Sequence, residues 1–250
     1  MKTAIRSVLA RLGYHIEGIL YTPRQLLDSD RLRSLEFDDV ICRHMFDRGE
    51  ACTFVQVGAY DGVSTDPLRK YVERCGWRGL MVEPQPGPAA RLRALYASNE
   101  RISVVEAAID AAPGRRILYT VECNELPKWA GGMASFSRDH ILKHDYLIPG
   151  IARWMREISV PCITFPQLLD RLDGNRIDLL QIDAEGADGL IISLFPFDRL
   201  KPSIIQWEVK NMAREEQERT LNLLHIHGYR IARSGQEDML AVLIAEDELN

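Results

Sequence analysis

The chain has 250 residues, of which 46% are hydrophobic and 27% are charged, and its formal net charge is −5. This is the composition of an ordinary globular protein, and the length allows one domain with additions. The acidic balance gives no electrostatic reason to expect a nucleic-acid partner. The five cysteines are scattered and never spaced as CxxC, which favours a reducing, cytoplasmic location over a disulfide framework or a zinc site.

No apolar run approaches the ~20 residues that are needed to cross a bilayer, so no transmembrane segment is expected. Residues 1–12 carry apolar side chains at helical spacing, together with Lys2, Arg6 and Arg11. Such a helix would pack on its own domain or on a second subunit of a homo-oligomer, and its basic side chains could contact an anionic membrane surface. We predict that residues 1–50 form an N-terminal helical extension, with a second helix over Glu36–Arg48 and no catalytic chemistry.

A short apolar run at Thr53–Val57 ends in a turn that contains Gly58, Asp61 and Gly62, and a helix is expected to begin at Asp66-Pro67. A strand, a glycine-bearing turn and a helix form the opening unit of doubly wound α/β domains, whose ligands bind at the carboxyl ends of the strands. A carboxylate in this turn disfavours a dinucleotide pyrophosphate, which needs bare backbone N–H groups. It suits the cationic methionyl group of S-adenosylmethionine (SAM). An ordinary βα turn explains the same residues equally well.

The second strand, predicted over Gly79–Glu83, ends in an acid. Glu83 lies about 20 residues beyond the glycine turn, where a doubly wound nucleotide site places a carboxylate on the ribose hydroxyls. The alternative is a surface glutamate, but three nearby prolines would form a rigid wall beside it. The helix between the two strands is predicted over Pro67–Cys75, with buried Leu68, Tyr71, Val72 and Cys75. A helix over Arg91–Ala97 and a strand over Ile102–Glu106 follow.

Residues 107–163 interrupt the alternation of strands and helices, and an insertion of this length is uncommon unless it has a role such as a lid over the acceptor. We predict a strand over Arg115–Glu122, a hinge at Gly131-Gly132, and short helices over Ser137–Tyr146 and Ile151–Glu157. Its aromatic side chains could stack on sugar rings or form a small helical core: Trp129, Phe136, Tyr146 and Trp154. His140 and His144 are interpreted as two exposed histidines on one helix turn rather than as metal ligands.

The alternation resumes with a strand over Ile158–Ile163 and a helix over Phe165–Leu172. Ile177–Ile182 is a continuous apolar strand, as expected of a central parallel strand, and it ends in Asp183-Ala184-Glu185-Gly186. The next strand, Ile204–Val209, carries Glu208 near its end. A helix over Arg214–His227 and a hairpin of Tyr229–Arg233 with Met239–Ile244 close the chain.

Three stretches in this order are distinctive: Val57–Ser64, Gly79–Pro86 and Ile177–Asp188. On them the chain resembles the FkbM family of SAM-dependent O-methyltransferases, over roughly Phe54 to Ile244. The resemblance implies a class I methyltransferase fold over residues 51–250, with SAM as methyl donor and a hydroxyl acceptor, often on a sugar or a secondary metabolite. This fold is a doubly wound, mostly parallel α/β sheet, and its closing antiparallel hairpin is absent from standard dinucleotide folds.

The candidate cofactor-binding residues lie in the glycine turn and at the ends of the neighbouring strands. Where a generic SAM turn reads GxGxG, this one runs from Gly58 to Gly62 with Ala59, Tyr60 and Asp61 between, a departure that the resembled family shares. We expect Asp61 to lie near the methionyl ammonium and Glu83 on the ribose. The predicted set is Gln56, Gly58, Ala59, Asp61, Gly62, Ser64, Glu83, Pro84, Ala107 and Asp183.

Asp183, Glu185 and Glu208 are three acids predicted at the acceptor side of the sheet edge, and they permit two mechanisms. One carboxylate could act as the general base that takes the acceptor proton, with its pKa raised by burial and by the neighbouring acids. Alternatively, Asp183 and Glu208 could hold Mg²⁺, which lowers the pKa of a bound hydroxyl. Glu185 could instead be an acid favoured at a helix N-terminus. Asp183 ranks first as the catalytic residue.

The favoured function is SAM-dependent O-methyl transfer to a hydroxyl of a sugar, glycan or glycosylated metabolite. A second hypothesis is an NAD-dependent sugar-modifying enzyme, but Asp61, the missing GxGxxG motif and the antiparallel finish count against it. A third is a non-catalytic SAM-binding protein, which the retention of all three acids disfavours.

Overall fold

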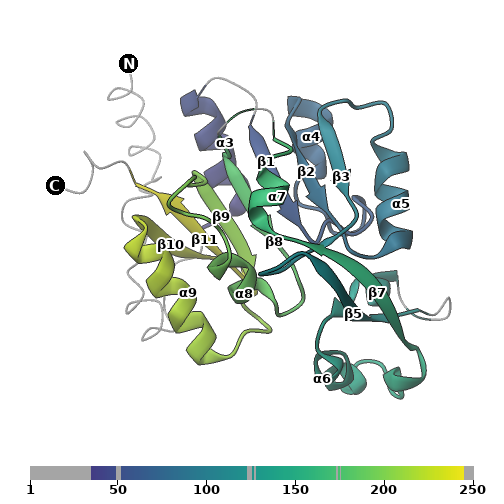
Figure 1. The fold of residues 1–250 in the computed structure, drawn as a ribbon. Helices are drawn as coiled ribbons and strands as arrows, with labels where there is room; N and C mark the ends of the chain where they lie inside the picture. Colours follow the sequence, from purple (N-terminus) through teal and green to yellow (C-terminus); the bar gives the residue numbers. More distant parts are fainter. Residues whose placement is uncertain are drawn as a thin grey trace.

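The main element of the fold is a seven-stranded sheet with the strand order β10-β11-β9-β8-β1-β2-β3 (Figure 1). The computed structural model describes residues 35–48, 52–122, 126, 128–172, 174 and 176–244. In this order, β9, β8, β1, β2 and β3 are each parallel to their neighbours among these five strands. Strand β11 is antiparallel to both β9 and β10, so the predicted sheet with its closing hairpin is confirmed. The strands are β1 (Thr53–Val57), β2 (Arg78–Val82), β3 (Ile102–Val105), β8 (Leu179–Ile182), β9 (Ile204–Glu208), β10 (Tyr229–Ser234) and β11 (Asp238–Leu243).

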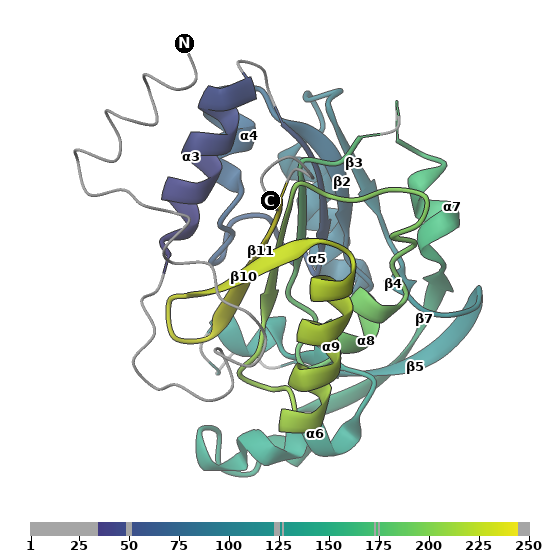
Figure 2. The same ribbon diagram turned by 90° about the vertical axis from the view of Figure 1, so that its left-hand side faces the viewer.

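Helices cover both faces of this sheet (Figure 2). The helices α3 (Phe37–Arg48), α4 (Arg69–Cys75) and α5 (Pro86–Leu95) pack on one face, and α7 (Phe165–Leu169), α8 (Asp188–Ser193) and α9 (Arg214–Ile226) pack on the other. Successive side chains of a strand point to opposite faces, so β1 contributes Phe54 to the first core and Val55 to the second. The central strands are therefore apolar over most of their length, as the sequence predicted.

The insertion forms a second sheet of four strands in the order β4-β7-β5-β6, beyond the carboxyl ends of the main strands (Figure 1). Its strands are β4 (Ala108–Ile109), β5 (Gly114–Val121), β6 (Ala134–Ser135) and β7 (Met155–Ile163). Between them lie three 3₁₀ turns and a helix, η2 (Lys128–Gly132), α6 (Arg138–Leu142), η3 (Lys143–Tyr146) and η4 (Ile151–Arg153). A core of its own holds this segment together, with Met133, Ile141 and Ile151 buried in it.

The end of the insertion differs from the sequence prediction in two ways. The strand predicted over Ile158–Ile163 is present as the second half of β7, but it belongs to the second sheet, where β7 pairs with β5 from Val121↔Met155 to Gly114↔Cys162. The helix expected over Ile151–Glu157 is only the short turn η4, because β7 already begins at Met155. Only Val160 and Cys162 of β7 are fully buried, which is the pattern of a sheet covered on one face.

The helices after β1 and β2 begin elsewhere than predicted. Helix α4 begins at Arg69 rather than Pro67, because the carboxylate of Asp66 accepts the backbone N–H of Leu68 (2.8 Å) in the turn before it. Cys75, predicted to be buried, is exposed. Helix α5 begins at Pro86 rather than Arg91, since proline at the first helical position has the required φ and needs no N–H partner.

Helix α3, the described part of the N-terminal extension, is anchored on the amino end of β8. Nε2 of His44 donates to Oδ1 of Asp178 (3.1 Å), and the same carboxylate accepts the backbone N–H of Thr53 (2.8 Å). Burial raises the pKa of Asp178, but these bonds and the Arg176 guanidinium outweigh it and lower the pKa to about 2. The helix predicted over residues 1–12 lies outside the described residues. Within the described part of the chain, no helix is long and apolar enough to cross a membrane.

The carboxyl ends of β1 and β8 come together at Gly58. This residue has a φ of +86°, and a Cβ atom there would lie 1.8 Å from the carbonyl oxygen of Asp183. The backbone N–H of Asp183 donates to the carbonyl oxygen of Val57 (2.9 Å), so the two strands stay paired up to this point. Glycine is required here by the contact between two strands as well as by the backbone conformation.

We expect Gly58→Ala to lower the free energy of unfolding by about 3 kcal/mol or more, since backbone strain and overpacking each cost roughly 1–3 kcal/mol. Urea denaturation measures the change. Gly114→Ala at the start of β5 is the matched control, because a Cβ there meets no described atom within 4 Å. A Gly58→Ala protein as stable as the control would contradict this account of the strand contact.

Candidate functional site

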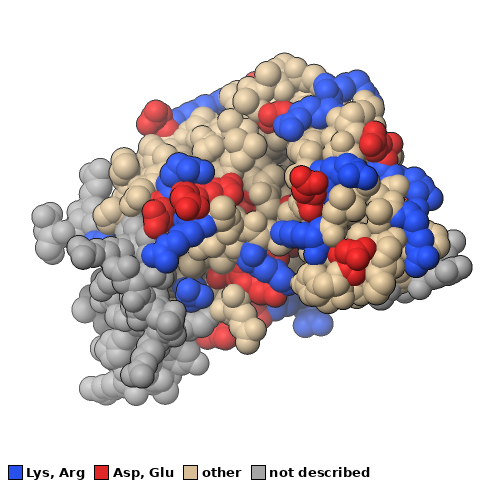
Figure 3. Space-filling view, turned by 90° about the horizontal axis from the view of Figure 1, so that it is seen from below, with Lys and Arg blue, Asp and Glu red and all other residues tan. Residues whose placement is uncertain are grey.

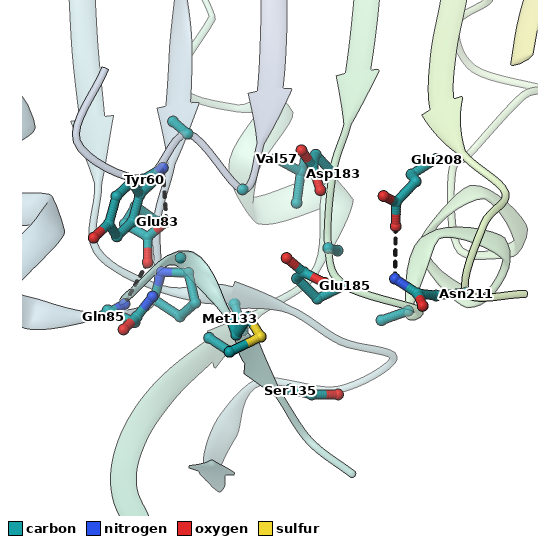
Figure 4. Close-up of a pocket in the computed structure, with 18 of the residues that line it drawn as sticks. Val57, Tyr60, Glu83, Gln85, Met133, Ser135, Asp183, Glu185, Glu208 and Asn211 are labelled. Carbon is teal, nitrogen blue, oxygen red and sulfur yellow. Dashed lines mark hydrogen bonds between the residues drawn. The ribbon is translucent and has the colours of Figure 1, made fainter. Parts of the chain in front are cut away.

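A pocket of about 490 Å³ lies between the carboxyl ends of β1, β2, β8 and β9 and the inserted segment (Figure 4). The main sheet supplies one wall, and the insertion supplies the other through residues such as Ile109, Leu118 and Met133. Most of the residues predicted as cofactor-binding or catalytic line it: Gln56, Gly58, Ala59, Ser64, Glu83, Pro84, Ala107, Asp183, Glu185 and Glu208. The structure therefore brings strand ends that are far apart in sequence into one cavity.

Asp61 and Gly62, which were also predicted to bind the cofactor, are not among the described residues that line the pocket. The carboxylate of Asp61 accepts the backbone N–H groups of Val63 (3.0 Å) and Ser64 (2.8 Å). Burial raises the pKa of Asp61, but these bonds outweigh it and hold the pKa below its usual value. A Cβ at Gly62 would lie 2.5 Å from a methyl group of Leu92. Asp61 thus closes its own turn, and Gly62 lets helix α5 pack against that turn.

Glu83 is only 3% exposed at the end of β2, and its carboxylate links two loops. One oxygen accepts the backbone N–H of Tyr60 and the other accepts that of Gln85, both at 2.8 Å (Figure 4). Burial raises the pKa of Glu83 to about 7 in spite of these bonds. Each carboxylate oxygen can accept a further hydrogen bond, so Glu83 can hold the loops and still bind a hydroxyl-bearing ligand in the pocket.

A second cluster of polar side chains lines the pocket: Gln56 on β1, Gln181 on β8, and Asp66. Of these three residues, the sequence analysis predicted only Gln56 as a cofactor ligand. Gln56 and Gln181 are register partners, and Nε2 of Gln56 donates to Oδ1 of Asp66 (3.0 Å). Three buried oxygens there have no hydrogen-bond partner among the described residues: Oε1 of Gln56, Oε1 of Gln181 and Oδ2 of Asp66. Buried acceptors without partners are costly, so this group fits a ligand that brings several N–H donors. The sequence signal was a glutamine within each of two apolar strands.

The three predicted acids lie on the opposite side of the pocket from Glu83 (Figure 4). Asp183 follows β8 directly. Its side chain is exposed to the pocket, although many protein atoms surround its carboxyl group. Burial raises its pKa well above the usual value, and repulsion from Asp188, Glu185 and Glu208 adds to the effect. Burial, followed by repulsion from Glu185, raises the pKa of Glu208 to about 7, against a hydrogen bond from Asn211. Glu208 can therefore exchange a proton near neutral pH, and Asp183 binds its proton more tightly than an ordinary aspartate does.

The turn that carries these acids is strained and is fixed from beneath by Asp188. Glu185 has a φ of +49° and Gly186 a φ of +91°, a combination found where surrounding contacts impose the conformation. Asp188 is fully buried and accepts the backbone N–H groups of Gly186 (3.2 Å) and Glu208 (3.3 Å). Burial and the charge of Glu208 raise the pKa of Asp188 to about 7. It ties the loop after β8 to the end of β9.

His140 and His144 are not exposed, contrary to the prediction. The ring of His140 lies against Gly186, where a Cβ would be 3.0 Å from it, and its Nε2 is 3.6 Å from Oε2 of Glu185. His144 lines the pocket, is buried, and donates from Nδ1 to the carbonyl oxygen of His140 (3.0 Å). Helix α6 of the insertion thus rests directly on the loop that carries the catalytic candidates.

A second connection joins the insertion to Glu208. Nζ of Lys143 donates to Oδ1 of Asn211 (2.6 Å), and Nδ2 of Asn211 donates to Oε2 of Glu208 (2.8 Å). The segment from His140 to Lys143 is therefore close to Glu185 directly and linked to Glu208 through Asn211. Sequence reasoning missed Lys143 and Asn211, because their contact spans 68 positions of the chain.

Asp183 and Glu208, the predicted metal ligands, both line the pocket. Within the described residues, no three or more His, Cys, Asp and Glu side chains are grouped to hold a metal ion. Mg²⁺ is often bound through one or two carboxylates with water and substrate oxygens completing the shell, so the pair suits only an open site of that kind.

The sequence pattern of the methyltransferase FkbM domain matches residues 56–231, from β1 to β10. The chain belongs to the FkbM methyltransferase family. The matched region contains Glu83, the buried Gln56–Asp66–Gln181 group and all three pocket acids. The matched family model describes a methyltransferase domain, and the sheet of this chain has the class I fold of such domains.

The chain is similar in structure to several solved proteins of low sequence identity. One is methyltransferase FkbM from Methylobacillus flagellatus, 13% identical, with a TM-score of 0.48 over 90% of this chain and 49% of that chain. Another is precorrin-6y C5,15-methyltransferase from Geobacter metallireducens, 12% identical, with a TM-score of 0.42 over 87% and 96% of the two chains. The N-terminal domain of human METTL16 is 13% identical, with a TM-score of 0.43 over 84% of this chain and 67% of that chain.

This FkbM-family chain spans about half the length of the first of those structures (49%). No protein of curated function matches it in sequence.

Because folding raises the pKa of acids in the pocket of this FkbM-family protein, we expect the stability of the fold to depend on pH. A carboxyl group whose pKa is raised by folding stabilises the fold below its unfolded pKa, and this contribution is lost as the pH rises through the folded pKa. For Glu208 the window runs from about 4.5 to about 7. As the pH rises from 5 to 8, we expect the Tm of wild type to fall relative to the Tm of Glu208→Gln, both measured without ligand. The variant should fold normally, since glutamine can still accept the hydrogen bond from Asn211.

Glu215→Gln, at an exposed position at the start of α9, controls for the loss of one negative charge. A Glu208→Gln protein whose Tm difference from wild type is the same at both pH values would show that Glu208 titrates as an ordinary surface acid.

Proposed function

We propose that this protein is an O-methyltransferase that transfers the methyl group of SAM to a hydroxyl of a sugar, glycan or glycosylated metabolite. The observation that carries the proposal is the division of one pocket into a ribose-type carboxylate at Glu83 and a cluster of titratable acids across from it. The scattered cysteines support action in a reducing cytoplasm. The net charge of −5 supports a small-molecule or glycan acceptor rather than a nucleic acid.

The pocket offers a partner for each polar part of SAM. Glu83 would accept hydrogen bonds from the ribose hydroxyls, in the position that the sequence predicted. The methionyl ammonium would donate to the unpartnered oxygens of Gln56, Asp66 and Gln181, which replace Asp61 in this role. A cationic donor with several N–H bonds removes the cost of burying these acceptors. Gly58, Ala59, Ser64, Pro84 and Ala107 line the pocket between the two ends.

SAM supplies a methyl group that is already activated by the positive charge on sulfur. The acceptor oxygen forms a bond to this methyl carbon while the carbon–sulfur bond breaks, and the bonding electron pair leaves with the sulfur. The acceptor proton must then go to a base. Asp183, at the end of β8, would take it, and Glu208 with a pKa of about 7 is the second candidate. An alternative to a free base is Mg²⁺ held by Asp183 and Glu208.

The insertion over residues 107–163 would act as the acceptor lid of a methyltransferase domain that extends over 51–250, with 1–50 as a separate helical extension. The insertion supplies one wall of the pocket, including Trp129, Met133, Phe136 and His144. Gly131 packs closely against the hydroxyl of Tyr60, whereas a Cβ at Gly132 would meet no described atom within 4 Å. Movement at this pair would open or close the insertion over the cofactor turn.

Isothermal titration with SAM and with NAD tests the cofactor directly, because an NAD-dependent enzyme would bind only the latter. In the same assay we expect Glu83→Gln to weaken SAM binding by about tenfold or more, since removing a charged hydrogen-bond partner costs roughly 1.5–3 kcal/mol. Glu100→Gln, an exposed position before β3, should bind like wild type. Because Glu83 also holds Tyr60 and Gln85, the Tm of each variant must be measured alongside, and an unchanged dissociation constant in a folded Glu83→Gln would refute its assignment.

Asp183→Asn keeps the size of the side chain but removes its charge, which is needed when the acceptor proton leaves. We expect turnover with a pooled sugar and glycoside library to fall by ~10²-fold or more, with little change in SAM affinity. A structural Asp183 would lower the Tm and leave the turnover of folded protein nearly intact. Adding EDTA to wild type distinguishes the metal mechanism, which alone should lose activity and recover it with Mg²⁺. Turnover within about threefold of wild type would transfer the base role to Glu185 or Glu208.

A further inference from the structure

Exposed apolar side chains gather at the mouth of the pocket. Seven large hydrophobic residues are exposed in the described part of the chain, and four of them line this one cavity. We call these four the collar: Trp129 (48% exposed), Tyr146 (75%), Leu147 (51%) and Leu190 (48%). The other three, Val63, Ile117 and Ile226, are not among the described lining residues. Apolar residues collected at a cavity entrance, rather than scattered singly, indicate a surface that contacts a ligand.

The collar comes from both sides of the pocket. Trp129 belongs to η2, Tyr146 and Leu147 lie in and after η3, and Leu190 lies on α8 of the main domain. The face of the molecule seen from below carries acidic and basic side chains interspersed with uncharged ones (Figure 3). A molecule that enters between the insertion and the sheet would thus meet apolar side chains first, on two opposing elements.

The same pocket also holds the carboxyl groups of Asp183, Glu185 and Glu208. Exposed apolar side chains and acids in one pocket fit a molecule with both kinds of surface. The aromatic members of the collar could stack on a sugar ring, but Leu147 and Leu190 can offer only apolar contact. A free sugar, with hydroxyl groups around its ring, would leave these leucines in contact with polar groups and gain little from them.

We propose that the acceptor is an amphiphile, with the methylated hydroxyl on a polar head group and an alkyl or aryl body held by the collar. This inference rests on the proposed function, since it names the class of acceptor for the same site. The head group would reach the acids while the body stays at the mouth, between Trp129 and Leu147 of the insertion and Leu190 of α8. Apolar contact at the mouth would place the head group for transfer without requiring the polar interior to recognise the whole molecule.

The test uses methyl, hexyl and octyl β-D-glucoside as probes of the full chain, below the critical micelle concentration, with and without S-adenosylhomocysteine. The head group is constant in this series, so any change in affinity reports the apolar body. We expect the dissociation constant from calorimetry to fall by about tenfold or more from methyl to octyl, because each buried methylene adds a similar increment. Tryptophan emission should shift to the blue with the octyl probe, since Trp129 would leave water.

Leu190→Asn and Trp129→Ala should each flatten this dependence on chain length, while leaving the affinity for S-adenosylhomocysteine unchanged. Ile226→Asn is the matched control, because Ile226 is 78% exposed on α9 and is not a described lining residue. Equal affinity across the series, no binding of any member, or an undiminished dependence in Leu190→Asn would overturn the inference. So would a dimer in size-exclusion chromatography that Leu190→Asn dissociates, because the collar would then belong to a second copy of the chain.

The two proposals fail in different ways. Binding of S-adenosylhomocysteine with a flat glucoside series would refute the amphiphilic acceptor and leave methyl transfer standing. A steep glucoside series without binding of SAM or S-adenosylhomocysteine would refute the proposed function and keep the collar as a site for amphiphiles.

Discussion

The close approach of β1 and β8 at Gly58 is the constraint on which the pocket depends. It sets the carbonyl of Asp183 against the Cα of Gly58 and lets the Asp183 N–H pair with Val57 before the two chains diverge. The cofactor turn and the acid-bearing turn therefore leave the sheet side by side. Any side chain at position 58 would separate them by displacing backbone, and the ligand groups on the two sides would no longer face one cavity.

Concentrating acids at one sheet edge has an electrostatic cost that neighbouring elements reduce. Burial and the charge of Glu185 raise the pKa values of both Asp183 and Glu208, and the charges of Asp188 and Glu208 add to the rise at Asp183. Asp188 fixes the spacing of the two loops through backbone N–H groups, and Lys143 reaches Glu208 through Asn211. The insertion thus supplies part of the charge compensation of a site that lies on the main sheet. Its position and the ionisation of the acids are coupled for this reason.

Local sequence patterns were sufficient to predict the strands of the main sheet and the acids at their ends. Apolar strands with acids at their ends located Glu83, Asp183 and Glu208, because parallel strands end at a common edge. Asp61, predicted near the methionyl ammonium, is not among the described residues that line the pocket. An Asp in such a turn is also a signal that the side chain binds its own backbone, as the bonds from Val63 and Ser64 show. The environment of His140 and the pairing of β7 with β5 depend on contacts across tens of residues, which no local pattern specifies.

Under the proposed reaction, the raised pKa values and the cationic donor are two parts of one charge balance. Before transfer, the pocket holds an ionised carboxylate beside a positive sulfonium, and these opposite charges compensate each other in a partly desolvated site. Transfer removes the positive charge from sulfur and releases a proton from the acceptor. A carboxylate with an ordinary pKa would hold that proton weakly and be left as an uncompensated negative charge among other acids. Because burial and repulsion raise the pKa of Asp183 and bring that of Glu208 to about 7, either group can take the proton as the positive charge on sulfur disappears. The net charge of the pocket is then the same before and after the step, and the repulsion that weakens the empty protein favours the proton transfer that the chemistry requires.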